Sequence, residues 1–111
     1  MEDKKKLPVK VSKLFTIDLD DIYKYGTITF GIRQAQIYES EIWKLVEGLS
    51  GNWPFFSECV HLPTKSKIYR WIILESHVII YRITVSEIQV LRIIHSSRSV
   101  SKIRTSRSIK L

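Results

Sequence analysis

Four side chains in this sequence have the types needed to act on a phosphodiester: His95, Arg98, Lys65 and Lys67. A histidine can serve as general acid or base near neutral pH, and an arginine can stabilise charge that develops on phosphate oxygens. The two lysines would join His95 and Arg98 only if the loop at residues 63–67 folds over the same end of a sheet. Without that convergence, His95 is a hydrogen-bonded structural residue and the lysines are solvated.

Three arginines interrupt segments that otherwise have the composition of buried strands: Arg70, Arg82 and Arg92. A buried guanidinium without a partner is costly, so each must reach solvent, an acidic residue of this chain, or another protein. The planar guanidinium suits two-pronged contacts with carboxylates. The pattern therefore indicates either internal ion pairs or an interface for an acidic partner.

The positive charge is concentrated at the C-terminal end. The net charge is +7, and from Ile88 onward there are six Lys and Arg residues, including Lys102 and Arg104, but no Asp or Glu. Such an asymmetry suggests a nucleic acid or an acidic protein surface as partner. The alternative is a solvated basic tail that only aids solubility.

Other chemistries find little support in the sequence. Cys59, His61 and His77, with His95, are the only soft metal ligands, and no paired motif completes a site. The four glycines have no phosphate-binding spacing, and no Gly-x-Ser-x-Gly elbow occurs. We therefore expect neither a metal nor a cofactor.

The length and composition predict one domain over residues 1–111, with a flexible N-terminus at 1–8 and a basic, serine-rich tail at 97–111. One cysteine cannot form an internal disulfide. No apolar run approaches the length of roughly 18 residues that a membrane span needs. We expect a cytoplasmic protein without a membrane partner.

Apolar periodicity predicts the elements that would position these residues. Residues 9–15 alternate as a strand, and a short helix follows through 19–25, capped by Thr16 or Asp18 and weakened at its end by Gly26. A longer helix at 32–49 begins after Gly31, and the two should form an antiparallel hairpin. Strands are expected at 55–62, 68–74, 77–84 and 88–95.

These elements predict an α+β fold: an N-terminal strand, a two-helix hairpin, and a sheet of three or four antiparallel strands. One face of the sheet packs on the hairpin. The other face is apolar, carries the strand arginines, and looks open to receive another chain.

Five segments in this order also match a known pattern. They are DLDDIYKY (18–25), FGIRQAQIYESEIWKL (30–45), IYR (68–70), HVIIYRI (77–83) and QVLRIIH (89–95). Spread over residues 9–100, they resemble the RelE/ParE superfamily of type II toxins, and specifically its ParE branch. Members commonly carry one or two arginines and an aspartate after the last histidine, whereas here only Arg98 matches and the acid is absent.

The resemblance implies a toxin that inhibits DNA gyrase by binding and is neutralised by a cognate antitoxin in a hetero-oligomer. The residues expected to bind the antitoxin or the target are Arg70, Arg82, Arg92, His95, Arg98, Lys102 and Arg104. The alternative is a RelE-type endonuclease that cuts messenger RNA on the ribosome. In that case His95, Arg98, Lys65 and Lys67 would be catalytic.

Overall fold

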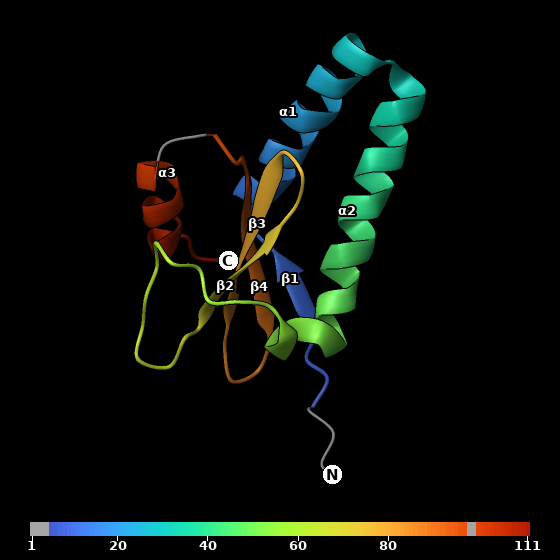
Figure 1. The fold of residues 1–111 in the computed structure, drawn as a ribbon. Helices are drawn as coiled ribbons and strands as arrows, with labels where there is room; N and C mark the ends of the chain where they lie inside the picture. The colour runs from blue at the N-terminus through green and yellow to red at the C-terminus, as the bar shows by residue number, and fades with distance from the viewer. Residues whose placement is uncertain (1–4, 98–99) are drawn as a thin grey trace.

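The computed structural model describes residues 5–97 and 100–111 (Figure 1). A helical hairpin lies on one side of a four-stranded sheet, and a short C-terminal helix lies on the other side. The elements are β1 (Val9–Val11), α1 (Lys13–Phe30), α2 (Ile32–Asn52), the 3-10 turn η1 (Trp53–Phe55), β2 (Tyr69–Ile73), β3 (His77–Ile83), β4 (Ile88–His95), α3 (Val100–Thr105) and the 3-10 turn η2 (Ser106–Ser108).

The sheet has the strand order β1-β4-β3-β2. β2, β3 and β4 are antiparallel neighbours, as predicted, and the β3–β4 register shifts at a bulge between Ile80 and Tyr81. β1 joins the edge of β4 in parallel, with Val9 opposite Ile88. The α+β fold is confirmed, but the sheet is mixed rather than wholly antiparallel.

The first helix begins earlier and ends later than the sequence predicts. Ser12 caps it by accepting a hydrogen bond from the Phe15 backbone N–H at 3.0 Å, so the predicted strand at 9–15 stops at Val11 and the predicted cap at Thr16 or Asp18 is wrong. The helix also continues through Gly26 to Phe30. This stretch has weak intrinsic helix propensity, and α1 as a whole packs on α2.

Both faces of the sheet are covered. On one face, Phe15 and Leu19 of α1 and Ile42 of α2 pack on Ile79 and Tyr81 of β3. On the other face, a second cluster includes Ile80, Leu91 and Ile94 of the sheet and Ile103 of α3. The expectation that this second face is open is therefore wrong, because the C-terminal segment lies on it (Figure 1).

Two further segments differ from prediction. Residues 55–62 do not form a strand: η1 is followed by an isolated bridge from Glu58 to Arg70 at the edge of β2. Near the N-terminus, Leu7 is buried and its backbone N–H donates to the Ser50 carbonyl at 3.0 Å. The flexibility expected at 1–8 stays a prediction, and residues 1–4 lie outside the described part of the chain.

Candidate functional site

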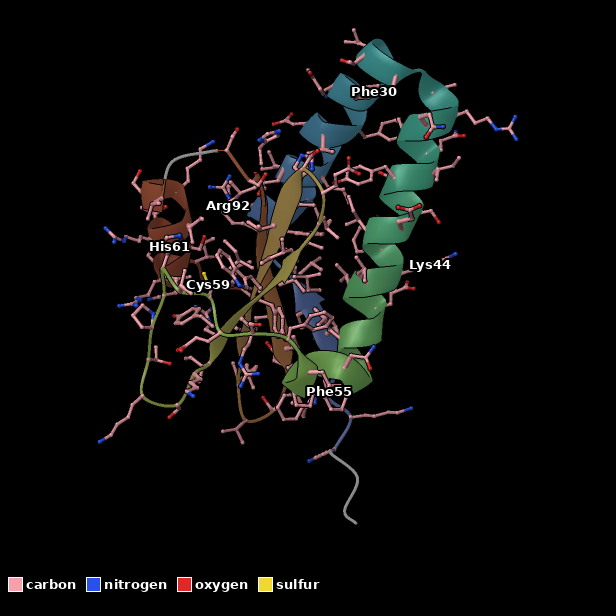
Figure 2. The ribbon with its side chains drawn as sticks, viewed as in Figure 1. Phe30, Lys44, Phe55, Cys59, His61 and Arg92 are labelled. Atoms are coloured by element: carbon pink, nitrogen blue, oxygen red, sulfur yellow. The ribbon has the colours of Figure 1, made fainter. Side chains whose placement is uncertain are left out.

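Arg92 and Asp18 join the sheet to the hairpin (Arg92 is labelled in Figure 2). The Arg92 Nη2 lies 2.6 Å from Asp18 Oδ1, and the Arg92 Nε donates to Asp18 Oδ2 at 3.0 Å. Asp18 Oδ2 also accepts from the Ile93 backbone N–H at 3.2 Å. The hydrogen bond with Asp18 raises the pKa of Arg92, so this arginine has its carboxylate partner inside the chain.

Arg82 holds the C-terminal segment against the sheet. Its Nη2 donates to the Ile109 carbonyl at 2.7 Å, and its Nε donates to Gln89 Oε1 at 2.8 Å. The guanidinium carbons of Arg82 and Arg107 each lie 5.8 Å from the centre of the Tyr69 ring. The two arginines and the ring thus anchor the segment that covers the second face.

Arg70 binds backbone carbonyls of the connection that precedes β2. Its Nη1 donates to the Phe56 carbonyl at 2.8 Å, and its Nε donates to the Lys67 carbonyl at 2.9 Å. All three strand arginines therefore have partners within this chain. Their contact with an antitoxin or target stays a prediction.

A chain of polar groups lies where β3 begins and β4 ends. Tyr38 of α2 and His77 of β3 share a hydrogen bond of 2.7 Å between Oη and Nδ1. The His77 ring lies 5.2 Å from the His95 ring, centre to centre, and His95 Nδ1 lies 2.7 Å from Ser97 Oγ. Burial, and then the neighbouring His95, lower the pKa of His77, which favours a neutral imidazole at this position.

These groups line a cleft of about 930 Å³ between the hairpin and the end of the sheet. Its wall includes Tyr25 and Phe30 of α1, Tyr38 of α2, and His77 and His95 of the sheet. Lys102 lines it as well, as do Asp21, Glu39 and Glu75. The cleft thus combines aromatic surface with charged groups of both signs, a combination that suits a peptide segment.

The outer end of the hairpin exposes large apolar side chains that the sequence analysis did not propose as a binding surface. Ile28 is 86% and Phe30 is 69% exposed, and Tyr25 and Ile32 are exposed beside them. Phe30 lies at the tip farthest from the sheet (Figure 2). The signal was present in the sequence, because these residues lie outside the core-facing positions once the helix runs through Gly26.

Of the predicted nuclease residues that the structure describes, Lys65 and Lys67 do not lie beside His95. Tyr69, which follows the loop with Lys65 and Lys67, pairs with Arg82, whereas His95 pairs with His77. The two pairing positions, His77 and Arg82, lie five steps apart along β3, or about 17 Å of strand. Arg98 lies outside the described residues.

The remaining predicted residues are placed as follows. Lys102 and Arg104 are exposed on α3, and His95 is exposed at the end of β4. Within residues 5–97 and 100–111, no three His, Cys, Asp or Glu side chains gather in a way that could hold a metal ion. None of the helices in the same part of the chain has the length and apolarity to cross a membrane.

Comparison with known proteins gives two findings. The family model for the ParE toxin of type II toxin–antitoxin systems, parDE, matches residues 9–100. A solved structure described as the chromosomal ParDE TA system from P. aeruginosa contains a similar chain, with a TM-score of 0.68 and 23% sequence identity. The alignment covers 83% of this chain and 98% of that one. No curated protein matches.

Proposed function

Since this chain belongs to the ParE toxin family of type II toxin–antitoxin systems, we propose that it stops growth by binding and inhibiting DNA gyrase. It is the toxin component of such a system, and an antitoxin is its partner. The family match over residues 9–100 is the observation that carries the proposal. Inhibition of gyrase is the action that the ParE branch implies.

The arrangement of the basic residues supports inhibition by binding over RNA cleavage. Cleavage requires an acid–base group and a cation at the same phosphate. His95 lies at the opposite end of β3 from the loop with Lys65 and Lys67, and the guanidinium of Arg92 is held by Asp18. The RelE-type endonuclease therefore remains the weaker alternative.

The cleft and the hairpin tip are the surface that we propose for the antitoxin. An amphipathic segment could cover the exposed Ile28 and Phe30 with its apolar side and extend past Tyr38 to His95. Of the residues expected to bind a partner, His95 lines the cleft and belongs to this proposal, whereas Lys102 and Arg104 are exposed on α3 and stay candidates for contact with the target. Arg70, Arg82 and Arg92 would act indirectly, because their guanidinium groups are engaged within the chain.

Controlled expression in bacteria tests the target. We expect the toxin alone to induce the DNA-damage response and filamentation while messenger RNAs stay intact, and coexpression of the antitoxin to restore growth. The purified toxin should inhibit supercoiling by purified gyrase. Truncated messages that disappear in a His95→Ala variant, with gyrase unaffected, would overturn the proposal in favour of the endonuclease.

A further inference from the structure

The C-terminal segment is fixed to the sheet with its apolar groups inward. Ile103 is 7% exposed, and the fully buried Ser106 has its hydroxyl 3.3 Å from the Lys102 carbonyl. Arg82 binds the Ile109 carbonyl, and Arg107 Nη2 reaches the Pro63 carbonyl at 3.4 Å. The described residues of this segment, 100–111, therefore form an ordered surface on the sheet.

Cations point outward from this surface. α3 and the loop at 60–68 lie on the same side of the sheet, opposite α2 (Figure 1). We call the exposed basic residues of the two segments the cationic face: Lys65, Lys67, Lys102, Arg104, Arg107 and Lys110. Within the described part of the chain, none of them forms an ion pair with a carboxylate.

Acidic residues are nearly absent from this region. Residues 61–68 and 100–111 contain no Asp or Glu. Glu58, at the base of the loop, is only partly exposed and accepts a hydrogen bond from the Thr64 backbone N–H at 3.1 Å. The cationic charge is thus not neutralised by neighbouring side chains of the chain itself.

From these observations we infer that the cationic face binds the phosphodiester backbone of a nucleic acid. Lys and Arg, with Ser and Thr hydroxyls, are the side chains that most often contact phosphates, and no sequence recognition is required of them. An interface for an acidic protein would need an apolar core. Here the large apolar side chains of the two segments that are more than a third exposed are Val60, Val100 and Leu111, each at an end of its segment.

The inference does not depend on gyrase as the target. It assigns to the toxin itself an affinity for nucleic acid, independent of any protein partner. Failure of nucleic-acid binding would leave the proposed inhibition of gyrase untouched.

Salt-dependent binding of the full chain to labelled duplex DNA and duplex RNA of the same sequence tests the inference. The test variant combines Lys102→Gln, Arg104→Gln and Lys110→Gln, whose side chains are exposed. The control variant combines Lys10→Gln, Lys13→Gln and Lys44→Gln, which are also exposed and remove the same net charge elsewhere. Fluorescence anisotropy gives the affinity, and circular dichroism checks that each variant is folded.

We expect the unmodified chain to bind with an affinity that falls steeply between about 50 and 200 mM salt. At the lowest salt concentration, the affinity of the test variant should be at least about tenfold lower. For duplex DNA, the slope of log affinity against log salt concentration should become less steep by about 0.9 for each lost phosphate contact. The control variant should stay close to the unmodified chain. Equal affinity for the DNA and RNA duplexes indicates that the face contacts the phosphodiester backbone alone. A higher affinity for one duplex identifies which of the two nucleic acids the face binds.

Three results would overturn the inference. The first is no binding to either duplex at low salt. The second is an equal loss in the test and control variants, which would mean that only net charge matters. The third is tighter binding of polyglutamate than of either duplex, lost in the test variant, which would assign the cationic face to an acidic protein.

Discussion

Arg92 and Asp18 lie 74 positions apart in the chain and form a two-pronged ion pair between β4 and α1. Their side chains are only 15% and 11% exposed. Removing one partner of such a pair leaves the other charge in a site with little water. The pair therefore fixes the hairpin to the sheet and makes each residue dependent on the other.

Asp18→Ala should destabilise the fold by about 3 kcal/mol, because it strands the Arg92 guanidinium. Urea unfolding followed by circular dichroism measures the loss. Asp20→Ala is the matched control, because it breaks the Asp20–Lys24 pair on the same helix, whose side chains are 60% and 70% exposed. Loss of so exposed a pair should leave stability nearly unchanged. Equal losses of unfolding free energy in the two variants would show that the buried ion pair contributes no more to stability than the exposed one.

Two glycines of the hairpin should respond in opposite directions to alanine. Gly26→Ala should raise stability by about 0.5–1 kcal/mol, because glycine inside a helix is unfavourable. The added Cβ would lie 3.5 Å from Ala35 Cβ, an ordinary contact. Gly31 has φ 92° and ψ 157°, a conformation that only glycine adopts readily, so Gly31→Ala should lower stability by about 1–3 kcal/mol. Thermal unfolding distinguishes them, and a loss for Gly26→Ala would contradict a continuous α1.

Stability should fall as the pH drops, in a way that depends on His77. Its folded-state pKa is lowered, so below the ordinary value near 6.5 the unfolded chain takes up a proton that the folded chain resists. Above about pH 6.5, His77 does not affect the stability of the fold. As the pH drops through that value, the stability declines. His77→Gln should therefore lose less stability than the unmodified chain between about pH 7.5 and 5.5.

His61→Gln is the control for that experiment, because His61 packs on Trp71 at a distance from the cleft. Denaturant unfolding at each pH gives the comparison. If the stability of His77→Gln and of the unmodified chain changes equally with pH, His77 does not contribute to the pH dependence.

The hairpin tip should contribute to antitoxin affinity. A variant with Ile28→Ser and Phe30→Ser removes two exposed apolar side chains, and it should weaken binding at least about tenfold because each buried side chain contributes about 1.5–3 kcal/mol. The fold should stay intact. Calorimetric titration with the antitoxin gives the affinity. Val85→Ser, at a residue 99% exposed in the β3–β4 turn, should bind as the unmodified chain does. Unchanged affinity in the double variant would remove the tip from the interface.

Local patterns predicted the elements whose neighbours are close in sequence. β3 and β4 have continuous branched apolar runs, and α2 has apolar residues at helical steps, so these three were recognisable. β1 joins β4 through pairs such as Val9 with Ile88, and no local pattern specifies so distant a neighbour. The C-terminal segment gave a signal only in Ile103 and Ile109, which is too sparse to predict that it covers the sheet.

The residue types of the candidate site could be predicted from the sequence, but the partner of each residue could not. Arg92 could be recognised as a charge in need of a partner, yet three Asp residues of α1 were available and only the fold selects Asp18. Arg70 and Arg82 bind backbone carbonyls, which every residue has and which leave no mark in a sequence. The separation of His95 from Lys65 and Lys67 follows from the direction and register of the strands. The sequence did not define that register, because the short links between the strands lack the glycine that identifies a turn type.

The parallel strand β1 has a consequence for synthesis of the toxin. It is synthesised before β4, but its place in the sheet exists only once β4 has been made, and the Ser12 hydroxyl binds the Leu91 carbonyl 79 positions later. The hairpin likewise waits for the strands on which its apolar side rests. A nascent toxin therefore cannot complete its sheet until the ribosome has synthesised β4.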